Sequence, residues 1–279
     1  TAFNMSAIKN KMTELDGDVS YIGLPTSVIH SLNFDQEVSR SAIGQPIGSF
    51  YAYKEDGLFQ SEAEIKSYTN NKGELLQPNA KPGDIKFVDV NGDGVIDGND
   101  RDYIGNPLPD VTAGLTLGVN FHNFDLSLFF QGMFGNDVYD LTRYVGDFYN
   151  QSQYNKNSRV VNAWTPTNTN TDIPRVTMDD PNNNIRPSSY YVQDASFVRL
   201  KNMKIGYSVP QSILSKIKFN SLYIYAQATN LFTITGYDGI DPEVGLQSYS
   251  SDYRNLDMGV DRGIYPLSRT FTFGVNVSF

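Results

Sequence analysis

The chain has 279 residues, no cysteine and a formal net charge of −9. The lack of cysteine excludes disulfide frameworks, thiol catalysis and zinc-thiolate centres, and the acidic balance without a dense Lys/Arg cluster argues against nucleic acid as a partner. No run approaches the roughly 20 apolar residues that a membrane-spanning helix needs, so a helical membrane protein is excluded.

The first eight residues, TAFNMSAI, predict a strand. They look like the middle of a strand, and they lack the charged and then apolar stretches of a signal peptide. We therefore expect the chain to be a piece of a longer protein.

A calcium-type loop follows at 89–100, DVNGDGVIDGND. Its oxygen-bearing residues stand at loop positions 1, 3, 5, 9 and 12, with Gly94 at position 6, which is the spacing of an EF-hand loop. No amphipathic helices flank it, and Asp replaces the usual Glu at position 12. The predicted Ca²⁺ ligands are Asp89, Asn91, Asp93, the Val95 carbonyl, Asp97 and Asp100. The alternative is an acidic turn without an ion.

Residues 111–121 and 124–134 alternate apolar with small or polar side chains and are separated by His122 and Asn123. This pattern predicts a hairpin with a very short turn. A long polar stretch, 136–194, comes next. Its aromatic residues could stack on sugar rings or clasp a peptide, or they could pack within the loops; they are Tyr149, Tyr154, Trp164, Tyr190 and Tyr191.

A second hairpin is predicted from strands at 197–207 and 222–232, joined by a connector at 210–219. Another long polar stretch, 236–267, leads to the last strand, 269–279. In that strand large apolar residues alternate with small or polar ones; they are Phe271, Phe273, Val275, Val277 and Phe279. A strand of a soluble sandwich would alternate in the same way, but a turn or a polar tail would usually follow it.

Short connectors and long loops therefore alternate along the chain. If the last strand runs towards the periplasm, parity places every long loop outside the cell and both short connectors in the periplasm, as in outer-membrane barrels. The predicted fold is all-β: a partial antiparallel transmembrane β-barrel with long external loops. About six strands cannot close a barrel, so we expect 1–279 to be the C-terminal portion of one, with the calcium loop outside.

The sequence offers no catalytic constellation. His30 and His122 are the only histidines, and they support neither a triad nor a histidine metal cluster. The adjacent Asp179 and Asp180 precede a proline and are typical of a solvated turn. We therefore do not expect an enzyme.

Eight stretches, taken in order, resemble the C-terminal part of the SusC/RagA family of TonB-linked outer-membrane transporters of Bacteroidetes. They are 44–51 (GQPIGSFY), 83–94 (GDIKFVDVNGDG), 104–109 (IGNPLP), 124–132 (FDLSLFFQG), 196–202 (SFVRLKN), 230–235 (NLFTIT), 241–243 (DPE) and 265–270 (YPLSRT).

This resemblance implies a large plugged barrel in the outer membrane, energised by TonB and lidded by a SusD-like lipoprotein that captures glycans or peptides. The plug and most of the barrel strands are not in this chain, so its partners would include the remainder of the same transporter. In such barrels the last strand is an assembly signal, here carried by Phe271, Phe273 and Phe279. The alternative from a different class is a secreted, calcium-stabilised β-domain that binds or cleaves polysaccharide.

Overall fold

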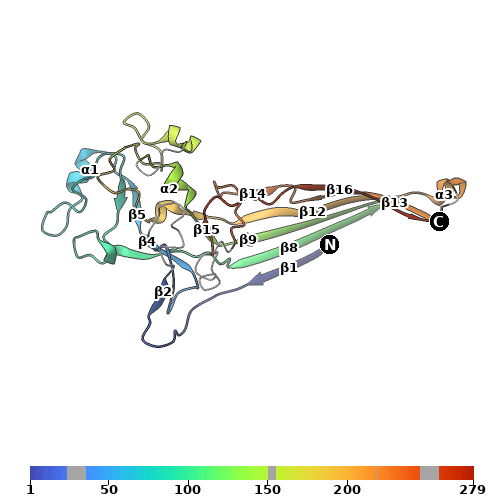
Figure 1. Cartoon of the computed structure of the whole chain (residues 1–279), viewed down its shortest axis with the longest axis horizontal. Helices are drawn as coiled ribbons and strands as arrows, with labels where there is room; N and C mark the ends of the chain where they lie inside the picture. The colour runs from blue at the N-terminus through green and yellow to red at the C-terminus, as the bar shows by residue number, and fades with distance from the viewer. Residues whose placement is uncertain (24–35, 150–154, 218, 246–257) are drawn as a thin grey trace.

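The computed structural model describes residues 1–23, 36–149, 155–217, 219–245 and 258–279. Figure 1 shows a long sheet that extends from a folded lobe. The alternation of apolar and polar residues explains why the long segments are strands, and the predicted all-β fold is confirmed.

The long sheet is antiparallel and open. Its strands follow the order β1 (Ala2–Ala7), β8 (Val111–Phe121), β9 (Phe124–Phe134), β12 (Phe197–Ser208), β13 (Ser221–Thr229) and β16 (Thr270–Ser278). β1 and β16 are the two edges and do not pair with each other. The expected partial barrel is therefore what the strands form.

The pairing register divides the sheet into an apolar and a polar face. Phe273 lies opposite Ala226, which lies opposite Ile205, and the row continues through Leu126 to Val119. Phe273 is 81% exposed, and the other large side chains of β16 are exposed as well. The terminal strand is thus not buried in the core of a sandwich. Its large apolar side chains lie on the exposed, apolar face of the sheet.

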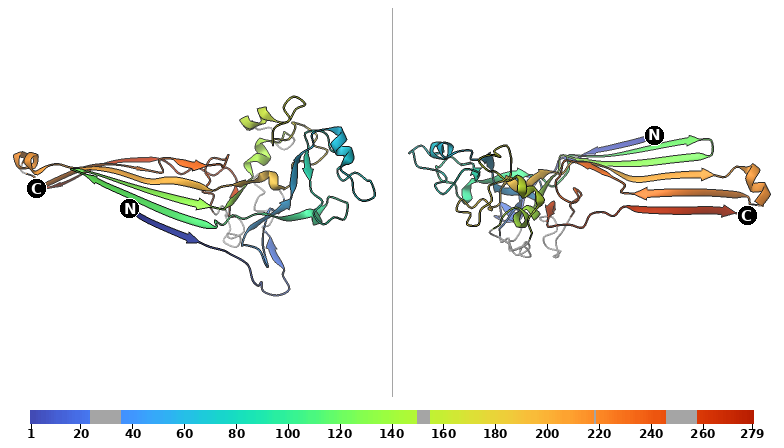
Figure 2. Two further views of the ribbon diagram at one scale, coloured as in Figure 1. Left: turned by 180° about the vertical axis from the view of Figure 1, so that it is seen from behind. Right: turned by 90° about the horizontal axis from the view of Figure 1, so that it is seen from above.

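The two ends of the sheet differ as predicted. At one end are the turn at His122 and Asn123 and a connector that contains the helix α3 (Gln211–Ile217). At the other end the long connections leave the sheet and enter the lobe. The right-hand view of Figure 2 shows the connector with α3 beside the C-terminus, far from the lobe.

The chain leaves the sheet earlier than predicted after β13. The expected strand at 222–232 ends at Thr229, because Asn230 adopts a positive φ of 51° and turns the chain. Beyond Leu231 and Phe232 the chain forms β14 (Thr233–Thr235), which pairs with the first residues of β12. Asn is one of the few residues with a side chain that tolerates this left-handed conformation.

The long connections are not irregular loops. They form three smaller sheets: β2 (Tyr21–Gly23), β3 (Ser39–Ala42), β4 (Ser49–Tyr53) and β7 (Arg101–Gly105); β5 (Glu55–Leu58) and β6 (Ile85–Phe87); and β11 (Val192–Asp194), β10 (Asp137–Asp140) and β15 (Val260–Asp261). The short helical segments are α1 (Glu62–Ser67), η2 (Gly98–Asp100), α2 (Thr142–Gly146), η3 (Ser158–Asn162) and η4 (Ser189–Tyr191).

One hydrophobic core joins the three long connections into the lobe. Phe50 comes from the first connection, Tyr139 and Tyr191 from the second, and Val260 from the third. The rings of Tyr139 and Tyr191 stack with their centroids 5.3 Å apart, and both residues are fully buried. The burial of such large aromatic groups from all three connections holds the lobe together as a unit.

Candidate functional site

A buried ion-pair network fastens the lobe to the long sheet, and we call it the Arg199 latch. Arg199 is 2% exposed. Its guanidinium donates hydrogen bonds from Nη2 to Asp241 Oδ1 (2.6 Å) and from Nη1 to Glu243 Oε2 (3.0 Å), and Nε donates to Thr233 Oγ1 (2.7 Å). Asp241 Oδ2 in turn accepts from the backbone N–H of Leu267. Four of the stretches that carry the family resemblance, at 196–202, 230–235, 241–243 and 265–270, therefore meet at one point.

A β-bulge places Arg199 in this latch. With uninterrupted alternation, Arg199 would share the outer, apolar face with Met203 and Ile205. The register between β9 and β12 shifts between Leu200 and Asn202, so one extra residue is inserted there. Arg199 then lies opposite Gln131, on the polar face of the sheet. Bulges re-aim side chains in this way.

The latch keeps the carboxylate of Asp241 ionised. Burial alone would raise its pKa, but the hydrogen bond from Arg199 and the backbone N–H groups of Glu243 and Leu267 lower the pKa below its ordinary value. The latch therefore stays charged and intact throughout the neutral range.

The stretch at 83–94 is held by a second buried pair. Asp84 is fully buried and accepts hydrogen bonds from Arg175 Nε (2.6 Å) and Asn184 Nδ2 (2.9 Å). Next to it Gly83 has a φ of 88°, and a Cβ there would lie 2.4 Å from the indole of Trp164. A glycine is thus required for Trp164 to pack over this turn.

In the predicted calcium loop the acidic side chains order the backbone. Asp89 accepts from the N–H of Gly92 and Gly94 at 2.8 and 2.9 Å. Asp100 is fully buried, and its two oxygens accept from the N–H groups of Val90, Asn91 and Asp97. Asp93 and Asp97 are exposed, and each caps its own turn.

Among the described residues, no three His, Cys, Asp or Glu side chains are grouped so that they could hold a metal ion. Four of the six predicted calcium ligands are aspartates, so this result applies to them: no three of their carboxylates are gathered around one point. The loop has side chains of the hard-oxygen type that Ca²⁺ prefers and a turn with positive φ at Gly92 and Gly94. In this structure those carboxylates accept hydrogen bonds from backbone N–H groups of the loop.

The predicted loop aromatics divide by burial. Trp164, Tyr190 and Tyr191 are buried in the lobe core, and Tyr149 is 40% exposed. Tyr154 lies outside the described residues. The hydroxyl groups of Tyr190 and Tyr191 donate hydrogen bonds to Asp147 Oδ2 and to the Ile185 carbonyl, respectively. Packing within the loops, the alternative that the sequence left open, describes the three buried residues.

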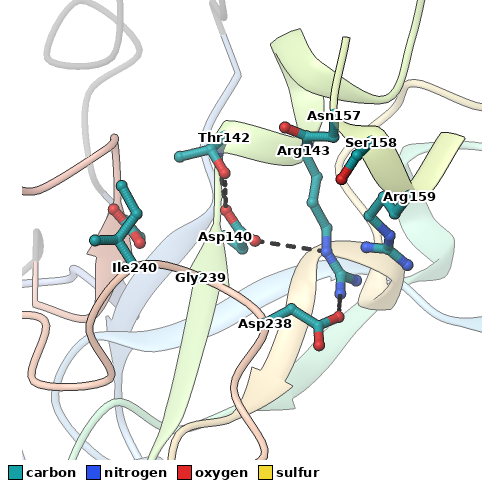
Figure 3. A pocket seen from close by; sticks show the side chains of 10 residues that line it. Asp140, Thr142, Arg143, Asn157, Ser158, Arg159, Asp238, Gly239 and Ile240 are labelled. Atoms are coloured by element: carbon teal, nitrogen blue, oxygen red, sulfur yellow. Dashed lines mark hydrogen bonds and ion pairs between the residues drawn. The ribbon is translucent and has the colours of Figure 1, made fainter.

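A polar cavity of about 540 Å³ opens in the lobe beside α2, as Figure 3 shows. Arg143 and Arg159 reach it from α2 and η3, and Asp238 reaches it from the connection after β14. The remaining residues that line it are Asp140, Thr142, Asn157, Ser158, Gly239, Ile240 and Asp261. The sequence does not reveal this site, because its members are scattered from Asp140 to Asp261 and form no motif.

Arg143 is the centre of this cavity. Its Nη1 donates to the Tyr190 carbonyl at 2.7 Å, its Nη2 to Asp238 Oδ2 at 3.0 Å, and its Nε lies 3.5 Å from Asp140 Oδ2. On the other side of Arg143 is a second cavity, of about 360 Å³, lined among others by Glu55 and Asp172. Arg143 and Asp238 thus line both cavities.

Burial shifts the acidity of several groups here. It raises the pKa of Asp140, against the hydrogen bonds from Thr142 and the charge of Arg143, which lower it. Burial, together with the charge of Asp172, raises the pKa of Glu55 to about 7. The cavities therefore contain carboxyl groups that gain a proton more readily than exposed ones do.

None of the helices within the described residues is long and apolar enough to cross a membrane.

No protein-family model matches the chain. TonB-dependent receptor P3 of Formosa agariphila is 38% identical over 280 residues, which is 100% of this chain and 26% of that receptor. TonB-dependent receptor SusC of Bacteroides thetaiotaomicron is 27% identical over 283 residues, which is 100% of this chain and 24% of SusC. The chain spans about a quarter of the length of the curated relatives it matches.

Solved structures show the same fold. The RagAB peptide transporter superposes with a TM-score of 0.69 at 22% identity, over 99% of this chain and 26% of its own. The RagAB peptide importer in the open-open state gives 0.70 at 23% identity, over 99% and 26%. An open sheet with an exposed apolar face, matched in fold and sequence by such proteins, is a section of an outer-membrane barrel. The chain belongs to the SusC/RagA family of TonB-dependent receptors of the outer membrane, as its sequence motifs indicated.

Proposed function

We propose that this chain forms the C-terminal part of the wall, and part of the external surface, of an outer-membrane receptor that imports glycans or peptides. The single observation that carries the proposal is the open sheet whose apolar face exposes large side chains on each of its long strands, from Phe3 on β1 to Phe273 on β16. Such a face is stable in lipid and unfavourable in water.

The two edges of the sheet support an assembly with further strands of the same receptor. In hydrocarbon, each unpaired backbone group of β1 or β16 would cost several kcal/mol, so both edges need partner strands. The lobe then lies on the external side, and the short connectors lie in the periplasm. The chain has a structural and ligand-contacting role in this assembly and no catalytic one.

The partners of the assembled receptor follow from its family. A SusD-like lipoprotein would cover the external side, where the lobe lies, and TonB would act through the remainder of the receptor. The similarity of this chain to SusC and to the RagAB peptide transporter supports this division. Glycans and peptides are both candidate cargo.

The loop at 89–100 is proposed to bind calcium as a structural staple of the lobe. Asp89, Asn91, Asp93, the Val95 carbonyl, Asp97 and Asp100 would supply the oxygen ligands, and Asp100 would also hold the loop in shape through the three N–H groups it already binds. Millimolar calcium outside the cell suits sites with dissociation constants of roughly 10⁻⁴ to 10⁻³ M.

Growth and fractionation test the proposed function. We expect the full receptor to be found in the outer-membrane fraction, to require detergent for extraction, and to co-purify with a lipoprotein encoded beside it. Deleting the receptor should abolish growth on one glycan or peptide mixture while growth on glucose is unchanged. Recovery of the protein in the culture medium without detergent would refute the proposal.

A further inference from the structure

Two guanidinium N–H groups at the cavity beside α2 have no hydrogen-bond acceptor among the described residues. They belong to Arg143 Nε and Arg159 Nη1. Each is close to a carboxylate only at ion-pair range, since Arg143 Nε lies 3.5 Å from Asp140 and Arg159 Nη1 lies 3.6 Å from Asp147. The Arg143 side chain is only 7% exposed. Buried donors without an acceptor are unfavourable, so these two guanidinium groups are placed to donate hydrogen bonds to an anionic oxygen.

The acidic residues around the cavity do not satisfy these donors, because most of them are engaged elsewhere. Asp140 accepts from the hydroxyl and N–H of Thr142 and from Gln193. Asp261 accepts from the Tyr237 hydroxyl at 2.6 Å and from two backbone N–H groups. Their oxygens are therefore committed to holding the lobe together.

Asp238 is different, because it can be replaced. Its side chain is 60% exposed, and one hydrogen bond of 3.0 Å from Arg143 Nη2 holds it. Because the Asp238 carboxylate faces solvent, an incoming carboxylate can take its place without leaving a buried acceptor unpaired. Figure 3 shows Arg143, Arg159 and Asp238 directed towards the same space.

We propose that this cavity is a binding subsite for a carboxylate carried by the imported ligand, held between Arg143 and Arg159 in the place of Asp238. A planar guanidinium binds a carboxylate through two parallel hydrogen bonds, and Ser158 at the cavity wall adds a neutral donor. The carboxylate can come from the C-terminus of a peptide or from a uronic acid of a glycan. The inference rests on the proposed function, since the ligand is the cargo of the receptor.

The test is calorimetry on the complete receptor, purified with its lipoprotein in detergent. The probes are trialanine against its C-terminal amide, and trigalacturonate against its methyl ester. We expect one of the two acids to bind. The affinity of its neutral counterpart should be lower by roughly tenfold or more, as the loss of a charge-assisted pair implies. The acid that binds identifies the source of the carboxylate.

Three variants sharpen the test. Arg159→Gln should weaken binding of the acid about tenfold, and Asp238→Asn should strengthen it several-fold, because it removes the internal competitor. Lys72→Gln, which removes one exposed positive charge elsewhere in the lobe, should change nothing. A general loss of folding would move the first two variants in the same direction.

Equal binding of acid and neutral form, no binding of any probe, or a shift of Arg159→Gln and Asp238→Asn in the same direction would overturn the subsite. The outer-membrane level of the wild-type receptor separates this failure from that of the proposed function. If the receptor is inserted normally and supports growth, only the carboxylate subsite is wrong.

Discussion

Removing Arg199 should detach the connections after β13 from the sheet. Arg199→Ala deletes the three hydrogen bonds to Asp241, Glu243 and Thr233 at once. The carboxylate of Asp241 is left almost fully buried, and among the described residues it keeps the N–H groups of Glu243 and Leu267 as partners. Lys201→Ala is the matched control, since Lys201 lies on the same strand and binds the same Glu243 at 2.7 Å.

The burial of the two pairs sets the expected magnitudes. Breaking a buried ion pair by removing one partner costs about 3 to 5 kcal/mol. The pair of Lys201 and Glu243 is partly exposed, and losing it should cost at most about 1 kcal/mol. The long sheet keeps its own pairing in both variants, so the loss is expected to be local.

Hydrogen exchange on the detergent-solubilised receptor measures this directly. In Arg199→Ala, the amides of Glu243 and Leu267 should exchange roughly 100-fold faster or more, at about 1.4 kcal/mol per factor of ten. In Lys201→Ala the change should stay within about fivefold. Equal exchange in the two variants, or unchanged exchange in Arg199→Ala, would refute the account of the latch.

Three further predictions concern separate parts of the chain. The raised pKa of Glu55, about 7 against 4.5 when unfolded, means that the folded lobe holds a proton that the unfolded chain releases. Raising the pH through this window should therefore lower lobe stability by up to about 3 kcal/mol, and Glu55→Gln should abolish this dependence in thermal unfolding by near-ultraviolet circular dichroism. Asp93→Ala should remove the protection that millimolar calcium gives the external loop against proteolysis, while heat-modifiable mobility of the barrel stays unchanged; equal protection in both proteins would refute the site. Deleting Phe279 should lower the outer-membrane level well beyond the loss of one lipid-facing ring, and normal insertion would count against an assembly signal.

Sequence periodicity was enough to predict the strands of the long sheet. A period of two with one apolar face is a local pattern, and residues 111–121 and 270–278 follow it without interruption. The open edges also followed from the strand count. The bulge at Lys201 could not be read from the pattern, because the polar residues around Arg199 fit either face.

The lobe was the part that the sequence did not reveal. Its core joins residues as distant as Phe50 and Val260, and pairing of this kind depends on contacts between three connections and not on local propensity. For Tyr190 and Tyr191 the sequence left contact with a ligand and packing within the loops as alternatives, because only the tertiary arrangement decides between them. The cavity at Arg143 arises only from that tertiary arrangement.

The orientation of β16 in lipid tests the central claim most directly. The chain has no cysteine, so single cysteines in place of Phe273 and Thr272 can carry a fluorescent label in the complete receptor, after replacement of any cysteine elsewhere. These neighbours lie on opposite faces of the strand. Brominated lipids should quench the label at position 273 strongly and the label at 272 weakly. Equal quenching at both positions would contradict a membrane-spanning wall. So would a result in which only aqueous quenchers reach the labels at both positions.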